Sequence, residues 1–253
     1  MTLYLIGLGL ENEKDITIKG LETINACSKI YLEGYTSLLQ CSIADLEKLY
    51  GKKIIIANRN FSESGCDNLL HEAKDVDIAF LIIGDPLSAT THIEFITRAK
   101  ELGVNLQIIH NASVLTAIGE TGLQLYKFGA TTSIPFLEDV PNLEAPYHRI
   151  RENHLLGTHT LCLLDLKPDQ DKYMTIPHAI KIIQDIEKRV GEGVITNNML
   201  VVGCSRLGTK TQLIKSGQLK EIVKIDFGPP PHCLIIPGKL HFVEKEMLDL
   251  WKI

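Results

Sequence analysis

The residues best suited to chemistry form one short stretch, Gly84–His92, which reads Gly-Asp-Pro-Leu-Ser-Ala-Thr-Thr-His. It follows the apolar run 78–83 and precedes an amphipathic helical pattern. Open α/β sheets bind ligands in such loops, outside the carboxyl ends of their strands. Pro86 favours an extended Asp85, and Gly84 allows another group to approach the backbone closely. This pattern predicts a ligand-binding loop.

An ordinary strand–turn–helix junction explains the same stretch on local chemistry alone. Thr91 and Glu94 have the capping-box spacing that begins a helix. Ser113 follows another predicted strand, where it can cap the next helix or present N–H groups to a carboxylate or ribose oxygen. Each stretch therefore keeps a structural and a functional interpretation.

Leu5–Leu10 is typical of a strand that ends in Gly-x-Gly, as in dinucleotide-binding folds. Glu33, at the end of the next predicted strand, stands where such folds place a ribose-binding acid. However, Asn12 takes the place of the third glycine, and Glu11–Asp15 inserts a charged loop before the helix. An NAD-dependent oxidoreductase is thus an alternative hypothesis, and a tight turn is the structural one.

The C-terminal part contains one further unusual segment, in which three prolines precede His232. Consecutive prolines hold the backbone stiff and extended, so they would present His232 at the start of a buried strand. A rigid connector is the structural alternative.

Several chemistries lack their sequence signatures. The nine histidines and six cysteines form no His-Glu-x-x-His or Cys-x-x-Cys pattern, and no carboxylate cluster suggests a hard cation. There is no Gly-x-Ser-x-Gly elbow or Walker A loop. We expect no metal site, and the scattered cysteines favour reduced thiols in a cytoplasmic protein.

Composition limits the partners. A net charge of −5 argues against nucleic-acid binding, and 45% hydrophobic residues are ordinary for a globular chain. No apolar run is long enough to span a membrane, and the N-terminus lacks a signal-peptide pattern.

Strand-like and helix-like segments alternate along the chain, which predicts an α/β fold with a mainly parallel N-terminal sheet. We expect two α/β domains, 1–112 and 113–253, with a ligand cleft between them. The predicted strands are 3–8, 29–33, 53–57, 78–83, 105–110, 131–135, 159–164, 199–204, 222–226 and 233–236. The predicted helices are 17–27, 42–50, 66–73, 91–102, 113–124, 146–155, 177–190 and 243–251.

Several segments together resemble one family of methyltransferases. They are residues 5–10 with 15–17, 84–92, 118–129, 159–167 and 226–241. In this order, over essentially the full length, they are similar to the diphthine synthases, which are tetrapyrrole-methylase-like (class III) S-adenosylmethionine methyltransferases. The continuation Leu87–His92 resembles this group rather than the porphyrin and precorrin methylases.

The resemblance implies two α/β domains, a homodimer, and a folded S-adenosylmethionine in the cleft, which leaves as S-adenosylhomocysteine. It implies elongation factor 2 as the substrate, at a histidine that carries a 3-carboxy-3-aminopropyl group. Its amine would be trimethylated, and a eukaryotic member, which segments 133–136 and 162–164 resemble, would also methylate the carboxylate to give diphthine methyl ester. The positions that match the family's cofactor contacts are Leu10, Asp85, Ser88, Ser113, Val114, Leu164, Leu207 and His232.

No catalytic residue follows from the sequence. Methyl transfer from a sulfonium mainly requires the reacting atoms to be held in line, and a desolvated cleft lowers the pKa of an amine. His232 or Asp85 could assist the proton transfer, but we assign both residues to cofactor binding in the first place. A non-catalytic protein that binds elongation factor 2 is a further alternative.

Overall fold

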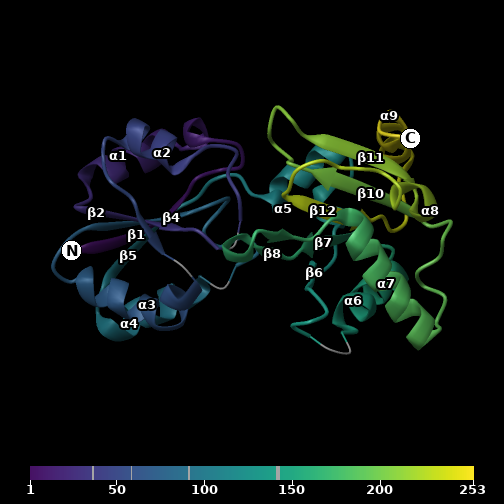
Figure 1. Cartoon of the computed structure of the whole chain (residues 1–253), viewed down its shortest axis with the longest axis horizontal. Coiled ribbons are helices and arrows are strands. Elements are labelled where there is room, and N and C mark those ends of the chain that lie inside the picture. The colour runs from purple at the N-terminus through teal and green to yellow at the C-terminus, as the bar shows by residue number, and fades with distance from the viewer. Residues whose placement is uncertain (36, 58, 91, 141–142) are drawn as a thin grey trace. The chain divides into compact units, whose positions relative to one another are not determined.

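The computed structural model describes residues 1–35, 37–57, 59–90, 92–140 and 143–253 (Figure 1). It divides into a first unit, Met1–Ala117 with Pro168–Gln170, and a second unit, Ile118–Lys167 with Asp171–Ile253. The sequence placed the boundary between residues 112 and 113, whereas the structure places it between Ala117 and Ile118. Residues 113–117 therefore belong to the first unit. Each unit is built around its own sheet.

The first unit contains a sheet with the strand order β3-β2-β4-β1-β5, in which all neighbours are parallel. This confirms the expected parallel N-terminal sheet. The strands are β1 (Thr2–Gly7), β2 (Lys29–Glu33), β3 (Ile55–Ala57), β4 (Ile78–Ile82) and β5 (Asn105–Ile109). The helices are η1 (Glu13–Asp15), α1 (Ile18–Ala26), α2 (Ile43–Tyr50), α3 (Arg59–Glu72), α4 (Ile93–Leu102) and α5 (Val114–Ala117), and η4 (Pro168–Gln170) also belongs to this unit.

Helices cover both faces of this sheet (Figure 1). The chain leaves β1 toward β2, but it leaves β4 in the opposite direction, toward β5. Because such crossovers are right-handed, the two connections lie on opposite faces. Accordingly, Ile24 and Leu46 of α1 and α2 belong to one apolar core, and Leu69 and Phe95 of α3 and α4 to another. The adjacent carboxyl ends of β1 and β4 therefore form the switch point at which open sheets bind ligands.

The second unit contains a mixed sheet with the order β11-β10-β12-β7-β6 and a small β8–β9 hairpin. Only β6 and β7 pair in parallel within the described part of this sheet. The strands are β6 (Thr132–Ile134), β7 (Thr160–Leu164), β8 (Leu166–Lys167), β9 (Lys172–Tyr173), β10 (Leu200–Ser205), β11 (Leu213–Gln218) and β12 (His232–Ile236). The helices are η2 (Ile118–Thr121), η3 (Leu125–Lys127), α6 (Ala145–Leu156), α7 (Ile176–Val190), α8 (Leu219–Ile222) and α9 (Phe242–Leu250).

Helix α7 shows why the sequence folds locally as it does. Thr175 caps its start by accepting a hydrogen bond from the backbone N–H of His178, and Gly191 ends it in the left-handed conformation. Apolar residues recur at helical spacing, so one stripe faces the sheet. This stripe packs with α6 into the core of the second unit, on the side of the sheet where Figure 1 shows both helices.

The structure differs from the sequence-based expectations in three segments. The strand predicted over 222–226 is wrong, because α8 ends at Ile222 and the next four residues form a turn and irregular structure. The helix predicted over 113–124 is reduced to α5 and η2, because Gly119 and Gly122 weaken helix propensity. Strand β11 had no prediction, since its sequence LIKSGQ contains few apolar residues.

The predicted capping box before α4 partly lies outside the described residues, because Thr91 does so. Helix α4 begins after His92, whose side chain makes no capping hydrogen bond. Among the described residues, no helix combines the length and apolar character required to cross a membrane.

A buried carboxylate, Glu244 of α9, ties together three segments of the second unit. It accepts hydrogen bonds from the backbone N–H groups of Gln124 (3.0 Å) and His241 (2.7 Å), from His159 Nε2 (2.9 Å) and from Lys127 Nζ. Gly238 N–H donates to His159 Nδ1 at 2.9 Å, so His159 Nε2 carries the proton. Burial acts to raise the pKa of Glu244, but these donors outweigh it and lower the pKa to about 2.

We expect Glu244→Gln to destabilise the protein at neutral pH by roughly 3 kcal/mol, because the folded carboxylate titrates near 2 instead of its ordinary 4.5. A lowered folded pKa stabilises fully above about pH 4.5, and this stabilisation is lost as the pH falls toward 2. Urea unfolding should therefore show a large difference from wild type at neutral pH and a smaller one in acid. Glu246→Gln, an exposed position on the same helix, is the control.

Candidate functional site

Asp85 organises the loop that follows β4. Its Oδ1 accepts hydrogen bonds from the Leu87 N–H (3.0 Å) and the Ser88 hydroxyl (3.3 Å). Its Oδ2 lies 2.8 Å from His110 Nδ1 and accepts a hydrogen bond from the Asn111 N–H at 3.1 Å. The carboxylate thus joins the loop after β4 to the end of β5.

The charge of Asp85 depends on this set of donors. Burial acts to raise its pKa, but the hydrogen bonds from Leu87, His110 and Asn111 outweigh burial and hold the pKa below its ordinary value. Asp85 is therefore ionised at neutral pH. Because all of these partners are protein groups, the carboxylate mainly shapes the loop that would meet a ligand.

A close backbone approach joins the two neighbouring strands at this edge. Gly9, after β1, and Gly84, after β4, exchange backbone hydrogen bonds of 3.3 and 2.8 Å. Both have positive φ values, +79° and +82°, which glycine adopts without strain. Next to Gly9, the Leu10 N–H donates to Asp15 Oδ2 at 3.1 Å, so Asp15 fixes the charged loop that replaces the dinucleotide fingerprint.

Ser113 and Val114 complete the first-unit group of candidate residues. The Ser113 hydroxyl accepts a hydrogen bond from the Leu115 N–H at 3.2 Å, as a helix cap does. An added Cβ on Gly84 would lie 3.9 Å from Ser113 Cβ, so the two positions are close. Leu10, Asp85, Ser88, Ser113 and Val114 therefore gather at the carboxyl ends of β1, β4 and β5.

The other three candidates lie at one end of the second-unit sheet. Leu164 is the last residue of β7, His232 is the first of β12, and Ser205, which pairs with His232, is the last of β10. The register of β7 and β12 places Leu164 beside His232, one position beyond the pair Leu163–Cys233. Leu207 follows β10 by two residues. The eight predicted positions thus form two groups of neighbours, one within each unit.

His232 presents an unusual buried imidazole. Its Nε2 lies 3.0 Å from the Gly228 carbonyl oxygen and 3.1 Å from that of Pro229, so Nε2 carries the proton. Its Nδ1 is buried and has no hydrogen-bond partner among the described residues. Burial lowers the pKa of the ring, which keeps it neutral. Nδ1 is thus an acceptor available to a ligand that donates a hydrogen bond.

His232 also borders a small cavity of the second unit. The cavity measures about 290 Å³, and its other lining residues are Thr175, Pro177, Val223, Lys224, Ile225, Asp226 and Phe227. It lies beside the segment 228–231 that carries the three prolines. A buried acceptor at the border of a cavity suits a bound donor group.

Arg206 is a buried residue beside the second group of candidates that the sequence did not indicate. Its buried guanidinium donates to the Phe227 and Pro229 carbonyl oxygens and, on the other side, to the Thr211 carbonyl oxygen at 2.8 Å. It thereby ties the Leu207 loop to the segment before His232. Neither loop has a regular pattern, so only the fold could reveal this contact. His110 and Asn111 were missed for the same reason.

Glu33, the candidate ribose-binding acid, is buried in the first unit. Its Oε1 lies 3.1 Å from His92 Nε2, and both side chains are almost fully enclosed. His92 packs against Phe80 and Phe95. Glu33 therefore interacts with the end of the Gly84–His92 stretch and is not open to a ribose, which removes the support for an oxidoreductase.

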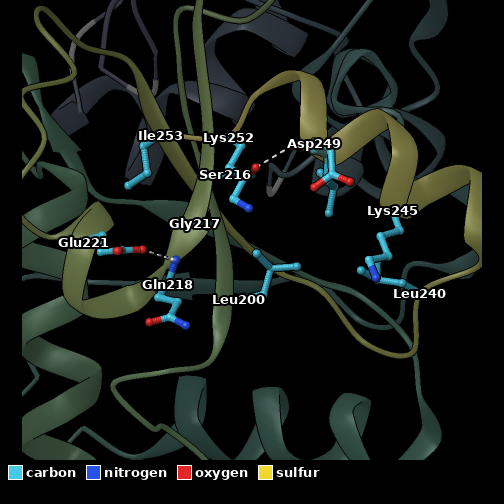
Figure 2. Close-up of a pocket in the computed structure, with 11 residues that line it drawn as sticks. Leu200, Ser216, Gly217, Gln218, Glu221, Leu240, Lys245, Asp249, Lys252 and Ile253 are labelled. Atoms are coloured by element: carbon cyan, nitrogen blue, oxygen red, sulfur yellow. Dashed lines mark hydrogen bonds between the residues drawn. The ribbon is translucent and has the colours of Figure 1, made fainter.

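A larger groove of about 370 Å³ lies elsewhere in the second unit (Figure 2). Lys245 and Asp249 of α9 lie on one side, and Gln218 and Glu221 on the other. None of the predicted site residues lines it. Its Ser216 hydroxyl already donates to the Leu248 carbonyl oxygen at 2.6 Å. Among the described residues, no group of His, Cys, Asp or Glu is arranged to hold a metal ion.

Comparison with known proteins identifies the family. Residues 2–223 match the family model of the tetrapyrrole (corrin/porphyrin) methylases. The chain is 45% identical to the diphthine methyl ester synthase of Dictyostelium discoideum, with 100% of this chain and 99% of the relative covered. It is 42% identical to the human diphthine methyl ester synthase, with 99% and 95% covered.

A solved structure shows the same relationship. A crystal structure of a diphthine synthase superimposes with a TM-score of 0.91 at 35% identity and covers 100% of this chain and 96% of the other. The chain therefore belongs to the tetrapyrrole methylase family and, within it, to the diphthine synthase group of methyltransferases.

Proposed function

We propose that this chain is the S-adenosylmethionine-dependent methyltransferase that makes diphthine methyl ester on elongation factor 2. The acceptor is a histidine that already bears a 3-carboxy-3-aminopropyl group, whose amine receives three methyl groups and whose carboxylate receives a fourth. One observation carries the proposal. The eight positions that match the family's cofactor contacts fall in only two places, at one end of each sheet.

The residues present fit S-adenosylmethionine. The buried His232 Nδ1 has no partner among the described residues and can accept a hydrogen bond from an exocyclic amino group such as that of adenine. At Gly84, an added Cβ would meet no atom closer than 3.9 Å, so there is room at the backbone for a ligand. Leu164 and Leu207 are apolar and largely buried near His232, so a base bound there would have apolar neighbours.

When bound, S-adenosylmethionine supplies an activated methyl group on a positively charged sulfur. The chain's own residues must hold an amine or carboxylate in line with that carbon and exclude water. The bonds that Asp85 and Arg206 make to their loops serve this purpose, because they fix the backbone at each group of candidate residues. Carboxylate methylation needs no base, whereas each amine methylation requires a neutral nitrogen.

Two further features belong to the proposal. The enzyme acts as a homodimer, as the family resemblance implies, with elongation factor 2 as the protein substrate and S-adenosylhomocysteine as the product. It works in the cytoplasm, where translation elongation occurs. All six cysteines are free thiols, which is consistent with a reducing compartment.

The activity is tested directly by mass spectrometry. Purified protein, S-adenosylmethionine and elongation factor 2 that carries the unmethylated intermediate should give a product whose mass rises in methyl-sized steps to four methyl groups. A product that stops at three removes the methyl ester from the proposal. Binding of elongation factor 2 without any gain in mass would instead indicate a non-catalytic binding protein.

Asp85→Asn should weaken S-adenosylhomocysteine binding by about tenfold or more, because hydrogen bonds to a charged group contribute roughly 1.5–3 kcal/mol. In the variant, the side-chain amide nitrogen of Asn cannot accept the hydrogen bonds that one carboxylate oxygen of Asp85 accepts, so the loop loses part of its support. Calorimetric titration measures the change, and Asp75→Asn, an exposed position of the same unit, should bind as wild type. Equal affinity in the Asp85 variant would contradict the assigned role.

His232→Gln should lower S-adenosylhomocysteine affinity by about fivefold to tenfold, the effect of one lost hydrogen bond. The Gln amide can still donate to the Gly228 carbonyl oxygen, but it lacks the Nδ1 acceptor. The affinity of analogues that contain only the amino-acid part of the ligand, without adenosine, should not change, which would place the lost hydrogen bond at the base. If both ligand classes weaken equally, His232 does not recognise the base.

A further inference from the structure

The described part of the chain contains several histidine–carboxylate pairs that differ in exposure. His92–Glu33 and His159–Glu244 are buried on both sides, and His148–Glu144 is exposed on both sides. In His110–Asp85, the carboxylate side chain is 9% exposed and the imidazole 66%. Only this pair, among those described, combines an orienting buried carboxylate with an accessible ring.

The geometry determines which nitrogen of His110 is available. Nδ1 lies 2.8 Å from Asp85 Oδ2, so in the neutral ring Nδ1 carries the proton and Nε2 holds the lone pair. Nε2 has no hydrogen-bond partner among the described residues. The next residue, Asn111, donates through its side chain to the carbonyl oxygens of Gly7 (2.9 Å) and Asp15 (3.0 Å). The ring is therefore held at the edge where the first-unit candidates gather.

The proposed reaction requires a base for the substrate amine, and no residue has been assigned to that role so far. An ammonium has no lone pair, so it must lose a proton before each of the three amine methylations. A carboxylate is already a nucleophile. A positioned neutral imidazole is the usual side chain for such a proton transfer. His232, the other candidate, also has an unprotonated nitrogen, but this Nδ1 is buried and is assigned above to the cofactor.

We propose that His110 is a catalytic base that takes the proton from the substrate ammonium before each amine methylation, with Asp85 holding its ring. This inference rests on the proposed function. The N–H bond breaks, and the proton passes to His110 Nε2. The freed nitrogen lone pair then forms a bond to the methyl carbon while the carbon–sulfur pair goes to sulfur, which becomes neutral. His110 returns its proton to water, and the ester step bypasses it.

Two variants separate a base from an anchor. In His110→Asn, the side-chain amide takes the place of Nδ1 and can still donate to Asp85, but nothing replaces Nε2. His110→Gln removes both the base and this hydrogen bond. His71→Asn, an exposed histidine of the same unit, is the matched control. Single-turnover rates are measured by mass spectrometry on elongation factor 2 with either the unmethylated amine or the trimethylated intermediate.

We expect His110→Asn to slow amine methylation by about 100-fold, the usual contribution of a general base, and to leave ester formation within about twofold of wild type. S-adenosylhomocysteine binding should stay unchanged. In His110→Ala, added imidazole should restore amine methylation, because the ring position is open to solvent. The rescue of His110→Ala by imidazole tests the base role independently, even if His110→Asn is poorly folded.

Other outcomes overturn specific statements. Full amine methylation by His110→Asn, with both steps impaired in His110→Gln, would show that His110 only anchors Asp85. An equal loss of amine and ester methylation in His110→Asn, without imidazole rescue in His110→Ala, would also overturn the base role. A wild-type protein that transfers no methyl group would contradict the proposed function itself.

Discussion

The group of candidate residues in the first unit depends on one buried charge, the carboxylate of Asp85. A buried anion is tolerated only when donors surround it, and here the donors come from the loop after β4 and from the end of β5. Satisfying the charge therefore brings these two strand ends together. The close contact of Gly9 with Gly84 adds the end of β1. Loop positions that are far apart in the sequence become one surface.

The second unit uses the same principle twice. Arg206 donates to backbone carbonyl oxygens of two irregular loops, and Glu244 accepts from segments that α9 would not otherwise hold. Such charges are costly to bury, but once satisfied they specify one loop conformation. The arrangement around His232 follows, because Arg206 and the His232 ring share the Pro229 carbonyl oxygen. Polar networks rather than regular elements thus shape both groups of candidate residues.

Most strands and helices could be predicted, because buried strands give continuous apolar runs and helices such as α7 give an apolar stripe with caps. The errors have physical causes. Strand β11 is an edge strand with a largely polar sequence, so it lacks the apolar run that predicts a strand. The apolar residues near Val223 pack on the core without forming a strand. The helix expected from Ser113 ends early because glycines follow it.

The sequence by itself determined the alternation of elements, the parallel first sheet and, through its resemblance, the family and the cofactor-matching positions. Only the tertiary structure decided what those residues do for one another. It buried Glu33 against His92, left His110 accessible beside Asp85 and joined two loops through Arg206. Periodicity reports which face of an element is buried. The pairing of charges between distant loops depends on strand order and register, which no local pattern contains.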